Sequence, residues 1–339
     1  MAEETGLDSA QSSWPPSAAT RRALLAMFSA TPIVAPAMAQ AEWPTRPVRI
    51  VTIFVAGGSG DTAIRALAAK AGEFLGQSIV IEARPGGKGV IAASAVQQAP
   101  ADGYTFLLEA ANGLTNPVLM RNLPFDYRAA FTPVTMTARF PQGLAVPANS
   151  PLRSVADFVA HARANPNNVS CGTPPIAGAG HFTVELLRLR GDVRLLHVPY
   201  RGGADAIRDL LGSRLDSAIL ATGTLRAPIE SGRVRLLAVT SAARSPAYPG
   251  VPTLAESGFP DIEQDDWNGL YAPAATSASI IQKLHAALAR AAADPHVRAQ
   301  MAPLGTVLAA SRPEDFAAWL DRERVVLRQI IQEAGITLE

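Results

Sequence analysis

Short apolar runs alternate with Ala- and Leu-rich stretches through the first third of the chain, beginning at residue 48. The runs are rich in β-branched and aromatic residues, which is typical of buried strands. The predicted strands are 48–54, 78–81 and 105–108, and the predicted helices between them are 62–75 and 90–98. This order predicts a parallel sheet with helices on both faces.

A second group of alternating elements begins after residue 143. Its predicted strands are 144–146, 169–171, 195–198, 217–220 and 236–239, and its predicted helices are 155–164, 181–190, 203–211 and 224–231. Ser154 directly precedes the first of these helices, and Asp157 lies three positions after Ser154. This spacing is typical of a helix that begins with a capping box. After a turn-rich stretch with four prolines, one more strand is predicted at 269–272 and helices at 277–292 and 313–334.

These two groups predict an α/β fold with two lobes, each a mostly parallel sheet flanked by helices. The last predicted strand and the two helices after it must pack against one of the two sheets, and we expect them to pack with the first group. The first lobe is then discontinuous, 43–142 and 266–339, and the second lobe, 143–265, is inserted into it. Two crossovers between such lobes place a cleft at the carboxyl ends of the strands, where α/β sheets bind ligands.

The first 39 residues have the three parts of a secretory signal peptide. Arg21 and Arg22 precede an apolar stretch from 23 to 39, and Ala37-Met-Ala39 is a small-residue cleavage site. A membrane anchor is disfavoured because the run is short and contains prolines. We therefore expect export to the periplasm with cleavage near Ala39, through the general secretory or the twin-arginine route.

Composition excludes several classes of protein. The 30 basic and 29 acidic residues almost balance, so nothing indicates nucleic-acid binding. Only three residues are lysines, which disfavours a polybasic membrane patch. The single cysteine, Cys171, excludes an internal disulfide, and the five histidines lack the spacing of a metal site. We therefore expect no metal.

The most informative local motif is the glycine-rich loop at residues 56–61, between the first strand and the first helix. Backbone N–H groups at a helix start, which glycines leave accessible, can bind a carboxylate or a phosphate. The alternative is a tight turn in which Asp61 or Thr62 caps the helix.

A dinucleotide site and a hydrolase site compete with this interpretation. Gly58-Ser-Gly60-Asp-Thr-Ala63 fits the G-x-G-x-x-A fingerprint, and Glu82 ends the second strand where a ribose-binding acid would lie. An exported NAD(P)-binding oxidoreductase is therefore the alternative function. A serine hydrolase is disfavoured, since Asp61 occupies the last glycine position of G-x-S-x-G.

Motifs spread through the chain resemble those of one family. They are Trp43-Pro-x-x-Pro47, Phe54-x-Ala-Gly-Gly-x-Gly-Asp61, Arg84-Pro-Gly-Gly87, Ala99-Pro-Ala-Asp-Gly-Tyr-Thr105, Asn122-Leu-Pro-Phe-Asp126, His197-Val-Pro-Tyr-Arg-Gly-Gly203, Val251-Pro-Thr-Leu-Ala-Glu256 and Trp267-x-Gly-Leu-Tyr-Ala-Pro273. In order and spacing they resemble the Bug-type extracytoplasmic solute receptors of tripartite tricarboxylate transporters.

The resemblance implies a periplasmic-binding-protein (Venus flytrap) architecture that closes on a small carboxylate. It implies a monomeric receptor rather than an enzyme, without a cofactor, that delivers its ligand to integral-membrane transporter subunits or to a sensor. The ligand-binding residues that it implies are Phe54, Ala56, Gly57, Gly58, Ser59, Gly60 and Asp61 in the first lobe; Asn112 and Thr115 near the far end of the ligand; and Thr173, Ala177, Gly178, Gly180, His181, Tyr200 and Asp205 in or after the second-lobe loop.

Two departures from the family pattern bear on the ligand. Ile53 stands where the family usually has proline, and the loop from Thr173 to His181 lacks the usual hydroxyl residues. Two prolines in that loop have no N–H to donate, and Ile176 adds apolar surface. We therefore expect a ligand whose body is more apolar than a tricarboxylate, such as an aromatic or medium-chain carboxylate.

Overall fold

The computed structural model describes residues 42–337 except 175 and 201. The predicted signal peptide lies outside the described residues. The first sheet has six strands in the order β11-β4-β10-β3-β1-β2. They are β1 (Val48–Thr52), β2 (Ile79–Ala83), β3 (Thr105–Glu109), β4 (Phe131–Phe140), β10 (Asp266–Pro273) and β11 (Val307–Leu308). β1 is parallel to β2 and β3, and the remaining pairs are antiparallel. The sheet is therefore mixed rather than mostly parallel as predicted, because β10 runs antiparallel to both β3 and β4.

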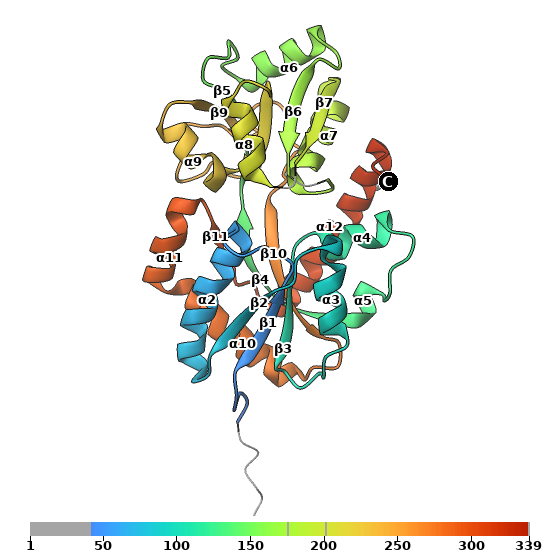
Figure 1. Ribbon diagram of the computed structural model, residues 1–339, viewed down its shortest axis with the longest axis vertical. Helices are drawn as coiled ribbons and strands as arrows, with labels where there is room; N and C mark the ends of the chain where they lie inside the picture. The colour runs from blue at the N-terminus through green and yellow to red at the C-terminus, as the bar shows by residue number, and fades with distance from the viewer. Residues whose placement is uncertain (1–41, 175, 201, 338–339) are drawn as a thin grey trace, which may run out of the picture. The chain divides into compact units, whose positions relative to one another are not determined.

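Helices cover both faces of this sheet, as the apolar runs predict (Figure 1). Ile50 and Phe106 pack on one face with α2 (Ser59–Leu75) and α10 (Ala278–Ala293). Val51 and Leu107, the next residue of each strand, pack on the other face with α3 (Val90–Gln97). Successive side chains of a strand point to opposite faces, so a strand buried on both sides has no polar alternation.

The second sheet has five strands in the order β7-β6-β8-β5-β9. They are β5 (Gln142–Pro147), β6 (Val169–Thr173), β7 (Leu195–Pro199), β8 (Ser217–Ala221) and β9 (Val234–Val239). Its helices are α6 (Val155–Ala164), α7 (Ala179–Gly191), α8 (Gly203–Leu211) and α9 (Thr222–Glu230). The predicted start of α6 is confirmed, since the Ser154 side chain accepts a hydrogen bond from the Asp157 N–H at 3.1 Å.

We call the part built on the first sheet the first lobe and the part built on the second sheet the second lobe. The chain crosses from β4 to β5 at Pro141 and returns through residues 240–265 to β10. The two crossings lie side by side, because the Thr240 N–H donates to the Gln142 carbonyl at 3.0 Å. We call this pair of adjacent segments the hinge.

A third connection between the lobes comes from the last helix, α12 (Pro313–Ala334). It packs against β4 and α4 (Asn112–Leu119) in the first lobe and against α7 in the second. Leu320 of α12 and Leu187 of α7 belong to one hydrophobic cluster. Figure 1 shows α12 beside both lobes.

The structure adds elements that the sequence pattern did not predict. These are β4, β11, α4, α5 (Tyr127–Ala130) and α11 (Pro295–Met301). The first strand also ends at Thr52 rather than at residue 54. β4 is the most consequential addition because it carries the chain into the hinge; Pro133 within it obscures the strand pattern.

Candidate functional site

The glycine-rich loop of the first lobe ends at the first turn of α2. Gly58 is the N-cap residue, with φ −71° and ψ 164°, and no side chain caps the helix. Among the described residues, the N–H groups of Ser59 and Gly60 have no hydrogen-bond acceptor. A helix start of this kind presents free donors and the positive end of the helix dipole.

The carboxylate of Asp61 holds this loop in place. Its Oδ2 atom accepts hydrogen bonds from the Gly57 N–H at 2.9 Å and from Arg65 Nε at 2.8 Å. The Arg65 hydrogen bond is the main reason why the pKa of Asp61 lies below its ordinary value. Only 2% of Asp61 is exposed, so its role in this structure is to position the loop, while Arg65 offsets its charge.

Glycine is required at position 60 by close packing. A Cβ atom there would lie 2.7 Å from Asn268 Nδ2 and 2.9 Å from the ring of Phe54. Phe54 and Asn268 of β10 therefore both pack closely against the first turn of α2. Ala56, Gly57 and Ser59 are exposed in the same loop.

The corresponding loop of the second lobe connects β6 to α7. Gly178 is the N-cap residue of α7, again without a capping side chain. Thr173 is fully buried, and its hydroxyl lies 2.7 Å from His197 Nε2. The one hydroxyl that the sequence offers in this loop is thus already engaged inside the protein.

His181 closes the second-lobe loop on itself. Its Nδ1 atom accepts a hydrogen bond from the Ala177 N–H at 3.0 Å, which places its proton on Nε2, 3.5 Å from Glu185 Oε1. The rings of His181 and His197 stack at 4.1 Å. Burial is the main cause that lowers the pKa of His197 to about 4, so this ring is neutral near pH 7.

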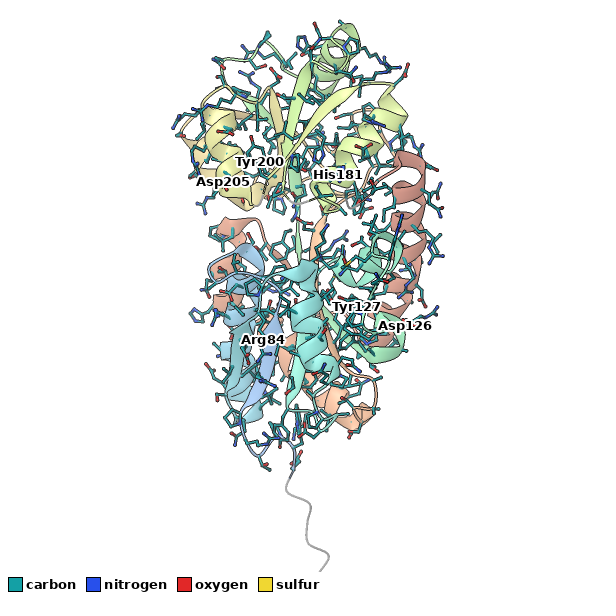
Figure 2. The ribbon with its side chains drawn as sticks, turned by 45° about the vertical axis from the view of Figure 1, so that its right-hand side comes forward. Arg84, Asp126, Tyr127, His181, Tyr200 and Asp205 are labelled. Carbon is teal, nitrogen blue, oxygen red and sulfur yellow. The ribbon has the colours of Figure 1, made fainter. Side chains whose placement is uncertain are left out.

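The remaining predicted residues fall into different surroundings. Thr115 is buried on α4, and Asn112 begins that helix. The Tyr200 hydroxyl donates to Asp209 Oδ2 at 2.8 Å, and Asp205 is exposed and paired with Arg208. Figure 2 shows His181, Tyr200 and Asp205 on the side of the second lobe that faces the first.

Sequence reasoning missed two residues of β10, the half-buried Asp266 and the buried Asn268. Asp266 Oδ1 accepts from the Ala179 N–H at 3.4 Å, and Oδ2 accepts from Gln142 Nε2 at 3.0 Å, so one carboxyl joins α7 to both crossings. Burial raises the pKa of Asp266 to about 6. Asn268, beside Gly60, has a buried Nδ2 without a partner among the described residues. Two consecutive acidic residues, Asp265 and Asp266, precede Trp267, and this pair was the signal in the sequence that could have pointed to the site.

Within the described part of the chain, no three His, Cys, Asp or Glu side chains are arranged to hold a metal ion. None of its helices combines the length and the apolar character that a membrane span requires. The site consists instead of two glycine-capped helix starts, one in each lobe. Such a pair suits a protein that binds an anionic solute between its lobes.

Comparison with known proteins identifies the class and then the family. The profile described as "Tripartite tricarboxylate transporter family receptor" (TctC) matches residues 63–336. The chain is 35% identical over 292 residues to a UPF0065 protein from a Pseudomonas species, covering 86% of this chain and 87% of that protein. It is 30% identical to BugT of Bordetella pertussis, covering 94% and 98%. The chain therefore belongs to the family of tripartite tricarboxylate transporter receptors, which are periplasmic solute-binding proteins.

Solved structures agree with this assignment. Rpa4515 of R. palustris, solved with adipate, superposes with a TM-score of 0.79 at 34% identity and covers 87% of this chain and 99% of its own. The periplasmic binding protein BugD gives 0.75 at 31% identity, covering 88% and 100%. The predicted two-lobed fold and receptor family are confirmed, and the comparisons give no support to the oxidoreductase alternative.

Proposed function

We propose that this receptor captures a small carboxylate-bearing solute between its lobes for a tripartite tricarboxylate-type transporter. The observation that carries the proposal is the pair of glycine-capped helices, α2 and α7, whose first turns lie on the facing sides of the two lobes (Figure 1). Free N–H groups in the first turn of each helix can bind a carboxylate without the help of a lysine or arginine side chain. The family likeness supports this chemistry, and we infer that the chain is not an enzyme.

The first lobe is the main carboxylate-binding side of the proposed site. Ser59 and Gly60 offer unpaired N–H groups, and Arg65 neutralises the only carboxylate in the first turn of α2. The incoming anion therefore meets hydrogen-bond donors without repulsion from an uncompensated charge. We assign Phe54 and Ala56 to the wall beside these donors.

The second lobe favours an apolar ligand body. Thr173 and the Ala177 N–H are engaged within the loop, which leaves the N–H groups of Gly178 and Gly180. Ile176 is 43% exposed there. A medium-chain or aromatic carboxylate matches a binding site with one polar end and one apolar end. The adipate in the related Rpa4515 structure supports this class of ligand.

Ligand capture is proposed to work by closure of the lobes about the hinge. We assign residues 43–142 and 266–339 to the first lobe and 143–265 to the second, because each sheet draws its strands from those ranges apart from Gln142, the first residue of β5. Only a closed form brings donors from both lobes to one ligand, so the ligand shifts the open–closed equilibrium toward closure.

Export and delivery complete the proposal. The signal-peptide features of residues 1–39 support cleavage near Ala39 and release into the periplasm. We infer a monomer that presents its ligand to integral-membrane transporter subunits or to a sensor. The family's transport role supports the first of these partners.

Isothermal titration with adipate, terephthalate, nicotinate and citrate tests the function and the ligand class together. We expect adipate or terephthalate to bind more tightly than citrate. Tight binding of citrate alone would contradict the apolar body. A thermal-shift screen of a wider carboxylate library in which no compound raises the melting temperature would contradict carboxylate binding itself.

A further inference from the structure

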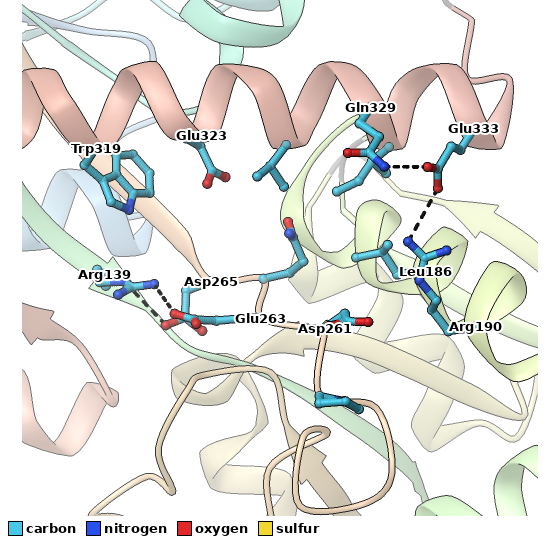
Figure 3. Close-up of a pocket in the computed structure, with 14 residues that line it drawn as sticks. Arg139, Leu186, Arg190, Asp261, Glu263, Asp265, Trp319, Glu323, Gln329 and Glu333 are labelled. Carbon is cyan, nitrogen blue, oxygen red and sulfur yellow. Dashed lines mark hydrogen bonds and ion pairs between the residues drawn. The ribbon is translucent and has the colours of Figure 1, made fainter.

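A cavity of about 360 Å³ lies beside the hinge (Figure 3), and none of its lining residues belongs to the first turn of α2 or of α7. One wall is a stripe of α12, another is the returning crossover, and the rest comes from α7 and β4. The α12 wall includes Trp319, Glu323, Val326 and Ile330, and the crossover wall includes Asp261 and Gln264.

Carboxylates outnumber cations in this cavity. Five acidic side chains line it, against the guanidinium groups of Arg139 and Arg190. Arg139 is shared by Glu263 at 3.1 Å and Asp265 at 3.5 Å, and Arg190 lies 3.5 Å from Glu333.

Among the described residues, Glu323 and Asp261 form no ion pair, although the nearby charge of Arg139 favours the ionised form of Glu323. Figure 3 shows Glu323 extending from α12 toward the crossover. Uncompensated carboxylates in a partly enclosed space favour a positively charged occupant.

An independent observation also indicates a missing partner. Gln264 lines the cavity and is only 6% exposed, yet no hydrogen bond to its side-chain amide is present within the described residues. The Gln264 amide is therefore available to an occupant of the cavity. A ligand with an N–H donor satisfies the Gln264 Oε1 atom as well as the Glu323 carboxylate.

The spacing of groups along α12 indicates the shape of such a ligand. Glu323 and Glu333 are ten positions apart, or roughly 15 Å along the axis at about 1.5 Å per residue. Val326 and Ile330 lie between them on the same face, opposite Leu186. Polar groups are therefore separated by an apolar stretch, and Trp319 adds an aromatic ring at one end.

We propose that the hinge cavity binds an organic cation, an ammonium group on a short aliphatic chain, with Glu323 and Gln264 as its main partners. The aliphatic chain of this ligand lies along Val326 and Ile330. This site is separate from the proposed carboxylate site and does not depend on it.

The position of the cavity couples it to lobe closure. Arg139 belongs to the first lobe, Leu186 to the second, and Gln264 to the hinge itself. A change in the angle between the lobes must alter these walls relative to one another. An occupant with different affinities for the open and closed forms therefore changes the affinity for the carboxylate, and the carboxylate changes the affinity for the cation by the same factor.

Calorimetric titration and thermal shift with 1,4-diaminobutane test the site in the mature protein. We expect saturable binding of the diamine, with an affinity that Glu323→Gln weakens at least tenfold. MgCl₂ at the same concentration of divalent charge should not raise the melting temperature comparably. Glu314→Gln is the matched control, because Glu314 lies exposed at the start of the same helix and pairs with Arg312. Failure of the diamine to bind, or equal weakening by both variants, would overturn the proposal.

A pH series gives a second measurement for the same variants. Burial raises the pKa of Glu323 to about 7, and the cation favours its ionised form, so diamine affinity should rise between pH 6 and 8. The charged groups around the ligand are Arg139, Glu263, Asp265, Asp261, Arg190 and Glu333. A pH-independent affinity in the wild-type protein would contradict the role of Glu323, whatever the outcome with carboxylates.

Discussion

The loops before α2 and α7 have similar backbones and different chemistry. Before α2, the N–H groups of Ser59 and Gly60 are unpaired, and Asp61 accepts hydrogen bonds from Gly57 and Arg65. Before α7, the Thr173 hydroxyl is hydrogen-bonded to His197, and the Ala177 N–H donates to His181. Two glycine-capped helix starts are therefore not equivalent anion sites, because internal hydrogen bonds decide how many donors remain.

The carboxylates near the two helices differ in the same way. Asp61 comes from the first turn of α2 and is neutralised by Arg65. Asp266 is the first residue of β10 and accepts a hydrogen bond from Ala179 in the first turn of α7, and burial raises its pKa to about 6. The second-lobe helix is thus fixed to the hinge, whereas the first-lobe helix is fixed to its own loop.

The largest expected effect tests the claim that the first lobe dominates binding. Gly58→Val places a branched side chain beside the free N–H groups, and we expect at least a 100-fold loss of carboxylate affinity by calorimetry. Gly178→Val, at the same position before α7, should lose only about tenfold, which corresponds to roughly 1.4 kcal/mol. Gly250→Val is the control, since a Cβ there meets nothing within 4 Å. Equal losses in the two lobes would refute the asymmetry.

Removal of the Asp61 charge tests how the first loop is held. Asp61→Asn should lower the free energy of unfolding by about 2 kcal/mol at pH 7, because charge-assisted hydrogen bonds are lost. The folded-state pKa of Asp61 lies below its ordinary value of 3.8, so this stabilisation is present above that pH and is lost as the pH falls through the lowered value. Urea unfolding at pH 7 and at pH 3 should show the difference shrinking. A difference that persists at pH 3 would contradict this account.

The neutral His197 makes the second loop sensitive to acid. Its folded pKa of about 4 lies below the ordinary 6.5, so the unfolded state binds the proton more readily and stability falls as the pH drops through this interval. We expect His197→Gln to lose less stability than the wild-type protein between pH 7 and pH 4.5, measured by urea unfolding. The exposed His161→Gln should behave like the wild type; if the three curves coincide, His197 is not the acid-sensitive group.

The substitution Thr173→Val should have the smallest effect on ligand binding. The substitution keeps the shape of the side chain but removes the partner of His197 Nε2, so about 1 kcal/mol of stability should be lost. Carboxylate affinity should stay within twofold of the wild type, because the hydroxyl is already used inside the loop. A tenfold loss by calorimetry would mean that Thr173 contacts the ligand directly.

Local pattern predicted the elements whose causes are local. Ser154 caps α6 with its own neighbour, and the apolar runs of β1 and β3 follow from burial on both faces. β4 was missed because its partners β10 and β11 are far away in sequence and Pro133 interrupts its pattern.

The same distinction explains the candidate site. The glycines before α2 are visible as a motif, but the use of Thr173 by His197 depends on the pairing of β6 with β7. The contact from Asp266 to Ala179 joins residues 87 positions apart, which no local pattern can reveal.

The strand order has a consequence for the sequence of folding events. Every strand of the second sheet lies between residues 142 and 239, so that sheet can assemble as soon as this segment is available. In the first sheet, β10 separates β3 from β4, and the sheet stays divided until residue 266 has arrived. Pairings over such long separations carry a high entropic cost and form slowly. We therefore expect the inserted part to fold early and the host sheet to be completed last.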